Sequence, residues 1–284
     1  PQVAFDSVWV SGQGAAGTIT RLDLASFEID AVIEIPGGQS GIDFGAGSIW
    51  VGTGAGGQIV RIDEATNEIV ATIDLGRPTT SGHFAFGSLW AIHTEDGLVT
   101  RIDGDTNRVV ATIDVGGNPR GETGDHAGSI WNADYENDRV NRIDPATNTI
   151  TAVVEIGPEL TGFDATEALG VWFADTSLDD LHVARIDPAT NEVTGAVRTG
   201  LVPLGLYADG GSVWNTAQTG CGTRSCQPAV VRIDPATGEV LDIIELGEIA
   251  AEPGGIWGQG DIFFVSGGGE DGDQIVPLYI GEPG

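Results

Sequence analysis

Short segments in which apolar and polar residues alternate recur along the whole chain. The apolar positions of residues 59–63, Ile-Val-Arg-Ile-Asp, fit a strand of a sheet that lies between two neighbouring sheets. Residues 69–73, Ile-Val-Ala-Thr-Ile, are rich in the β-branched residues that strands favour. Residues 41–44 and the segment around Trp50 complete a set of four short strands. The pattern therefore predicts an all-β protein built from four-stranded units.

The predicted unit repeats with a nearly constant period. A tryptophan lies in the second strand of the first six units, and Phe263 takes its place in the seventh. The tryptophans are Trp9, Trp50, Trp90, Trp131, Trp172 and Trp214. The steps are 41, 40, 41, 41, 42 and 49 residues, which is enough for four strands and too little for a domain. Such a period is typical of a β-propeller, whose units bury their faces against one another. We expect residues 1–284 to form one domain of seven four-stranded blades, the ends of the chain meeting in one blade; six blades is the alternative.

Two repeated features predict architecture. Residues 144–148, Asp-Pro-Ala-Thr-Asn, recur between the third and fourth strands, where Asp caps a turn, Pro presets φ and Asn accepts the left-handed conformation. An arginine precedes Ile-Asp or Leu-Asp in the third strand of the first six units, and we expect it to pair with a nearby carboxylate. The tryptophans are expected to pack between blades. These arginines are Arg21, Arg61, Arg101, Arg142, Arg185 and Arg232.

The repeated phrase resembles a known type of repeat. Residues 47–51, Gly-Ser-Ile-Trp-Val, a glycine-bearing loop, and Arg-Ile-Asp-Pro-Ala-Thr-Asn, as at 142–148, are similar to YVTN repeats and to the virginiamycin B lyase (streptogramin lyase) type of propeller. The resemblance implies seven blades. For the lyase it also implies a magnesium-dependent elimination that opens a cyclic depsipeptide at its ester bond. The lyase's histidine after proline and its glutamate three residues after the aromatic have no counterparts in this sequence.

The net charge of the chain argues against two classes of binding partner. The chain has 42 acidic and 12 basic residues, a formal charge of -30, and every basic residue is arginine. This field repels nucleic acid and anionic lipid, so we expect neither as a partner. No stretch approaches the 18 or more apolar residues of a membrane helix, and we expect no membrane insertion.

Two cysteines point to an oxidising compartment. Cys221 and Cys226 bracket four residues in the longest insertion of the repeat, where a disulfide would staple an exposed loop. Together with the lack of a starting methionine, they lead us to expect a secreted or extracytoplasmic protein.

Candidate chemistry lies where the copies of the repeat differ. The position three residues after the second-strand aromatic holds His93, Asp134 and Asp175 in three consecutive units. An imidazole and two carboxylates suit a divalent cation, Mg²⁺ or Ca²⁺, although polar residues are also expected at any exposed strand end. Arg120 and Glu122 fall on a loop that leads into the unit of Asp134. With His93 they form the candidate catalytic set, because arginine can grip a carboxylate or stabilise developing negative charge.

We therefore predict a monomeric binding or scaffold module that uses one propeller face for a small-molecule or protein ligand. The alternative is an enzyme, a metal-dependent C–O lyase or a lactone or ester hydrolase, with a divalent cation near the propeller axis. The sequence contains no nucleophile elbow, phosphate loop or HExxH motif. Metal binding near His93 and activity that is lost on chelation would distinguish the two.

Overall fold

The computed structural model describes residues 2–12, 17–80, 82–176, 182–219, 227–246, 252–259, 262–269 and 272–279. The chain separates into two compact units. Unit 1 consists of Pro1–Thr123, Asn132–Asn137 and Ile143–Thr151, and unit 2 consists of Gly124–Trp131, Asp138–Arg142 and Ala152–Gly284. In the part of the chain that is described, no helix has the length and apolar character needed to cross a membrane.

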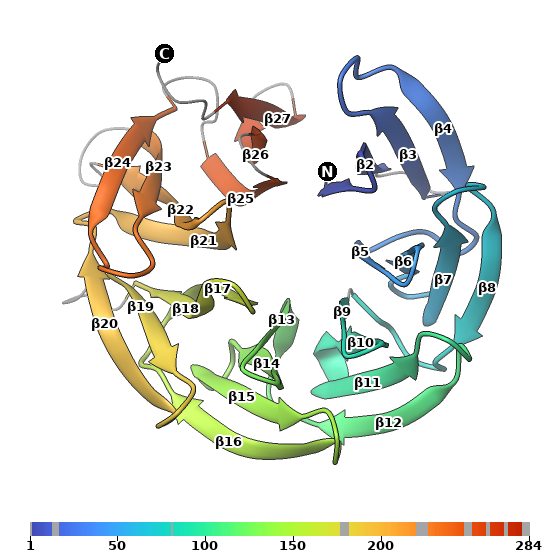
Figure 1. The fold of residues 1–284 in the computed structure, drawn as a ribbon, viewed down its shortest axis with the longest axis horizontal. Helices are drawn as coiled ribbons and strands as arrows, with labels where there is room; N and C mark the ends of the chain where they lie inside the picture. The colour runs from blue at the N-terminus through green and yellow to red at the C-terminus, as the bar shows by residue number, and fades with distance from the viewer. Residues whose placement is uncertain are drawn as a thin grey trace. The chain divides into compact units, whose positions relative to one another are not determined.

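Unit 1 contains three complete four-stranded sheets, each with its strands in chain order (Figure 1). The first is β1 (Gln2–Ala4), β2 (Ser7–Gly12), β3 (Thr18–Asp23) and β4 (Ile29–Glu34). The second is β5 (Gly41–Gly45), β6 (Ser48–Gly52), β7 (Gln58–Asp63) and β8 (Ile69–Asp74). The third is β9 (Gly82–Ala85), β10 (Ser88–His93), β11 (Leu98–Asp103) and β12 (Val109–Asp114), with a 3₁₀ turn η1 (Thr94–Asp96) between β10 and β11.

The fourth sheet contributes residues to both units. Its strands are β13 (Pro119–His126), β14 (Ser129–Asp134), β15 (Arg139–Asp144) and β16 (Thr149–Glu155).

Unit 2 contains two further four-stranded sheets and one with three strands. They are β17 (Leu160–Thr166), β18 (Gly170–Asp175), β19 (His182–Asp187) and β20 (Glu192–Arg198); β21 (Val202–Asp209), β22 (Ser212–Thr219), β23 (Gln227–Ile233) and β24 (Val240–Glu245); and β25 (Glu252–Gln259), β26 (Ile262–Gly269) and β27 (Gly272–Tyr279).

The strand count corrects the prediction of seven four-stranded blades. In the described ranges, six sheets have four strands, and the sheet of β25–β27 has three. The N-terminal strand belongs to the first sheet, in which β1 pairs with β2. Phe5 and Asp6 both have a φ of 53° and join β1 to β2, as the two central residues of a type I′ hairpin turn do. This tight local turn uses the first strand within its own sheet.

The tryptophans pack in the core as predicted. All six are at most 1% exposed. In unit 1, Trp9 lies in a cluster with Ile42 and Val51 of the next sheet, and Trp50 lies in a cluster with Leu89 of the sheet after that. Apolar burial between successive sheets is therefore what holds unit 1 together.

Arginines of the third strands staple successive sheets together. The Arg61 Nε donates to Ser48 Oγ at 2.8 Å, and its Nη1 donates to the Gly104 carbonyl at 2.6 Å and to Asn107 Oδ1 at 2.9 Å. The guanidinium carbon lies 4.7 Å from the centre of the Trp50 ring. These partners are neutral oxygens and an aromatic face, whereas the sequence predicted a carboxylate. The same stacking occurs for Arg21, Arg101, Arg142 and Arg232.

The predicted turn chemistry is confirmed. The Asp63 Oδ1 accepts hydrogen bonds from the backbone N–H groups of Ala65 and Thr66 and from the Thr66 hydroxyl. Asn67 has a φ of 60°, which is the left-handed conformation expected at this position. The hydrogen bonds from Thr66 lower the pKa of Asp63 below its ordinary value of 3.8.

Candidate functional site

One end of the sheets of unit 1 carries the loops that adjoin the predicted site residues His93 and Asp134. We call residues 36–40, 53–57, 75–80, 94–97, 115–118 and 135–137 the loop end of unit 1. Backbone hydrogen bonds join neighbouring loops there, from the Leu75 N–H to the Gly57 carbonyl and from the Thr79 N–H to the Gly54 carbonyl. Gly57 has a φ of 66°, and a Cβ there would lie 2.9 Å from the Arg77 carbonyl oxygen. Glycine is thus required for the two loops to approach.

His93 is the last residue of β10 and is fully buried. Its Nδ1 lies 2.8 Å from the Pro78 carbonyl, and its Nε2 lies 2.8 Å from Thr100 Oγ1. Because a carbonyl can only accept, we assign the proton to Nδ1, which leaves Nε2 to accept from the Thr100 hydroxyl. Both ring nitrogens are therefore engaged within the protein.

The protonation of His93 follows from the same surroundings. Burial lowers its pKa below the ordinary value of 6.5, and nearby Arg77 lowers it further, while the Pro78 carbonyl and Asp96 act in the opposite direction. The net effect is a lowered pKa, so the ring is neutral at pH 7. A neutral imidazole with no uncommitted nitrogen holds the loop of Pro78 against β10.

Asp134 ends β14 and is also fully buried. Its Oδ1 accepts from the backbone N–H of Asn118 at 3.0 Å, Glu136 at 3.2 Å and Asn137 at 3.4 Å. Its Oδ2 accepts from Asn137 Nδ2 at 2.9 Å. This carboxylate ties the loop 115–118 to the loop 135–137.

Thr53 performs the same task in the second sheet. Its hydroxyl accepts from the Gln58 N–H at 2.9 Å and lies 3.1 Å from the Gln58 carbonyl. In the second, third and fourth sheets, the residue three positions after the tryptophan thus fixes the backbone of a loop of unit 1. This is the structural use of the position at which the copies of the repeat differ.

Asp175 occupies the equivalent position in unit 2, at the end of β18, and is 2% exposed. Gly157 has a φ of 110°, and a Cβ at that residue would lie 2.7 Å from Asp175 Oδ2. Among the residues that the structure describes, no three or more His, Cys, Asp or Glu side chains are arranged to hold a metal ion. A divalent cation bound by His93 would have to displace one of the two hydrogen bonds of its ring nitrogens.

The structure describes the other predicted site residues only in part. Arg120 and Glu122 lie in β13, and their side chains are outside the described residues. Cys221 and Cys226 fall outside the described ranges, so the disulfide stays a prediction. The cation and the catalytic set also stay predictions.

Comparison with known proteins establishes the fold. No family model matches the chain, and no curated protein matches its sequence. The chain is similar to the β-propeller domain of Myceliophteria thermophila Cps50 (Swd1), with a TM-score of 0.70, 11% identity, and 95% of this chain and 93% of that chain covered. It has a β-propeller fold. The four-stranded sheets are its blades.

Two further structures share the propeller fold. A chain of the mitotic checkpoint complex has a TM-score of 0.73 and 10% identity, over 96% of this chain and 85% of that one. Kuenenia stuttgartiensis hydrazine synthase has a TM-score of 0.65 and 14% identity, over 84% of this chain and 76% of that one. At such low identity the likeness establishes the fold alone.

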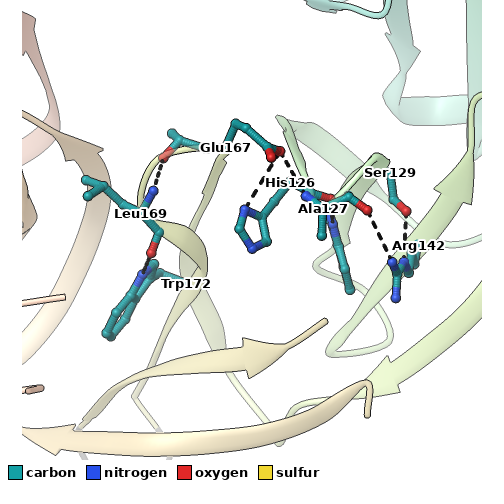
Figure 2. A network of polar contacts seen from close by, with 9 residues as sticks. His126, Ala127, Ser129, Arg142, Glu167, Leu169 and Trp172 are labelled. Atoms are coloured by element: carbon teal, nitrogen blue, oxygen red, sulfur yellow. Dashed lines mark hydrogen bonds and ion pairs between the residues drawn. The ribbon is translucent and has the colours of Figure 1, made fainter. Parts of the chain in front are cut away.

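Unit 2 of the propeller contains a groove that the sequence analysis did not anticipate. Its volume is about 460 Å³, and it is lined by His126, by the turn from Ala168 to Gly170, and by residues of the blade β17–β20 that include Arg185 and Thr194. Figure 2 shows the polar contacts beside it: Glu167 Oε2 accepts a hydrogen bond from the Ala127 N–H of another blade and lies 4.0 Å from His126 Nδ1. The sequence signal that could have revealed it is Gly170, which replaces the serine found at this position in the other four-stranded blades.

Proposed function

We propose that this propeller is a binding module that holds a protein partner or ligand at the loop end of unit 1. The observation that carries the proposal is how His93, Asp134 and Thr53 are used. Each is buried and hydrogen-bonded to a loop. Buried polar side chains that fix loops reduce the entropy lost when those loops meet a partner.

The loops held in this way present charged side chains to solvent. Glu95, Asp96 and Glu136 are exposed, and Arg77 forms an ion pair with Asp96 at 3.5 Å. Most of these charges are negative, in keeping with the charge of -30 for the whole chain. A partner with a basic contact surface therefore suits the loop end, because opposite charges steer association and favour the correct orientation.

The structural neighbours support the same class of function. One of them is part of the mitotic checkpoint complex, a protein assembly. A rigid fold that displays loops at the ends of its blades is suited to such use.

The test compares two triple variants with the same change in charge. Glu95, Asp96 and Glu136 are replaced by alanine in the loop-end variant, and Glu28, Glu68 and Asp105, which are exposed at or near the turns between third and fourth strands, are replaced in the control. A partner is captured on the immobilised wild-type chain, purified, and titrated against all three proteins. We expect the loop-end variant to bind at least tenfold more weakly and the control to bind within twofold of wild type. Equal affinity in all three, or no saturable partner, would show the proposal to be wrong.

Three more specific proposals, on family, location and enzymatic activity, rest on the sequence alone. Kinship with YVTN repeats and the virginiamycin B lyase type of propeller is proposed from the repeated phrase alone, and a secreted or extracytoplasmic location from Cys221 and Cys226. The metal-dependent lyase or hydrolase is the competing function. Calorimetric titration with Mg²⁺ and Ca²⁺ decides it, since saturable binding that is abolished in His93→Ala would favour the enzyme.

A further inference from the structure

One arginine of the repeat lacks both the serine acceptor and the tryptophan stacking that the other five have. Arg185 belongs to the third strand of the blade β17–β20, but Gly170 stands where Ser48 accepts from Arg61 in the second blade. Gly238 likewise stands where Asn107 accepts from Arg61, so no side-chain amide is available. Both side-chain oxygens of the staple are therefore missing for this arginine.

The structure reflects both replacements. Among the described residues, Arg185 makes one side-chain hydrogen bond, to the Pro235 carbonyl at a long 3.3 Å, and it is exposed. It is not stacked on Trp172, unlike the five other arginines on their tryptophans. Its stem instead lies across Gly195, where a Cβ would be 3.4 Å from Nε. Most of the guanidinium N–H groups thus have no acceptor in the described protein.

Arg185 is one of the residues that line the groove of about 460 Å³. The other lining residues include His126, Gly170 and the partly exposed Leu169, whereas Val171 and Ile186 also line the groove but are only 0% and 2% exposed. A volume of this size accommodates a small organic molecule.

The groove is held open by contacts that do not involve Arg185. Glu167 Oε2 accepts from the Ala127 N–H at 2.9 Å, and the Leu169 carbonyl accepts from the Trp172 indole N–H at 2.8 Å, as Figure 2 shows. The Pro188 carbonyl on the groove wall accepts from Arg142 at 2.6 Å. The site is therefore preorganised and needs no large rearrangement to accept a ligand.

We propose that this groove binds a small organic molecule through a carboxylate group, which Arg185 holds by paired N–H···O hydrogen bonds. A guanidinium presents two parallel donors that match the two oxygens of a carboxylate. The apolar part of the molecule lies against the partly exposed Leu169. A phosphate dianion fits less well, because Asp187 also lines the groove and the chain as a whole is strongly acidic.

The experiment follows the His126 imidazole by NMR, since the chain has only four histidines and His126→Gln assigns the signal. Acetate, benzoate and succinate are titrated in parallel with acetamide, benzamide and phenyl phosphate. We expect at least one carboxylate to shift the His126 signal saturably, with its amide at least tenfold weaker. Inorganic salt is kept constant, because a change in screening alone would move the signal.

Three variants locate the binding. Arg185→Met should weaken the bound carboxylate at least tenfold, and Arg185→Lys severalfold, because lysine keeps the charge and loses the paired donors. Arg108→Met is the matched control, since it removes the same charge from an exposed residue of unit 1 and should change the affinity less than twofold. Circular dichroism checks that each variant is folded. The proposal fails if no carboxylate in the panel shifts the signal, if amides or phenyl phosphate bind as well, or if Arg185→Met binds like wild type.

Discussion

Replacing Arg61 by methionine tests whether the arginine staple joins the blades. Methionine keeps an unbranched apolar stem but removes the guanidinium. The variant loses the hydrogen bonds to Ser48, Gly104 and Asn107 and the stacking of charge on Trp50. Since two of these four partners lie in the next blade, the loss should loosen the contact between blades as well as the sheet itself.

The expected cost follows from the number and length of these contacts. A hydrogen bond that involves a charged group contributes about 1.5–3 kcal/mol when well buried. Arg61 is half-buried, so we assign about 1 kcal/mol to each of its three hydrogen bonds of 2.6–2.9 Å. The cation–π contact adds about 0.5–1 kcal/mol. The sum is a destabilisation of about 3–4 kcal/mol.

Arg185→Met is the matched control, because the repeat places Arg185 at the same position without the staple. It loses one hydrogen bond of 3.3 Å from an exposed side chain, so we expect a cost below about 0.5 kcal/mol. The assay is urea unfolding followed by tryptophan fluorescence and by circular dichroism, with both midpoint and slope compared. Because each blade contacts chiefly its neighbours, a reduced slope for Arg61→Met alone would indicate that the blades near the change unfold separately. Similar costs for the two variants, or a cost below about 1 kcal/mol for Arg61→Met, would refute the staple.

Three further predictions concern pH and backbone strain. His93 has a lowered pKa, so the stability it confers is complete above pH 6.5 and declines as the pH falls from 6.5 through its folded pKa. Urea midpoints measured from pH 7.5 to 5 should show this decline in the wild type, and the decline should be absent in His93→Gln. Asp63 also has a lowered pKa, so the stability it contributes should be complete above pH 3.8 and disappear as the pH falls through its folded pKa. In Asp63→Ala, stability should therefore depend less steeply on pH below 3.8. Gly157→Ala would combine a φ of 110° with a Cβ 2.7 Å from Asp175 Oδ2, and its thermal midpoint should fall as for a loss of about 2 kcal/mol or more. Gly76→Ala is the control with a φ of 67° and open space around the Cβ, and its midpoint should fall only as for a loss of about 1 kcal/mol. Equal falls in the two variants would show that the contact with Asp175 has no effect.

Features of the fold that depend on neighbouring residues were predictable from the sequence. The turn at Asp63 uses partners two and three residues away, and these determine both its hydrogen bonds and the left-handed Asn67. The period of the tryptophans predicted their burial. Both follow from local geometry repeated along the chain, so a single sequence is enough to recognise them.

Features that depend on distant residues were not predictable in this way. Arg61 finds its acceptors at Gly104 and Asn107, 43 and 46 residues along the chain, and they are a carbonyl and an amide instead of the expected carboxylate. The strand count depended on whether β1 pairs with β2 or elsewhere, which the turn at Phe5 and Asp6 decides. For the candidate site, the sequence located His93 and Asp134 at the loop end but gave no sign that their polar atoms are committed to Pro78 and Asn118.

Differences between copies of a repeat therefore have two distinct physical meanings in this protein. His93 and Asp134 replace Thr53 with larger polar groups, yet all three side chains serve the same purpose of fixing a loop. Gly170 does the opposite, because it removes an acceptor and leaves a charged donor, Arg185, without the partners that its counterparts have. A polar residue that replaces another in the core indicates a structural role. A residue that removes the hydrogen-bond partner of a charged side chain leaves that side chain available to a ligand. On this reasoning the glycine at residue 170 is a stronger indication of a binding site than the histidine at residue 93.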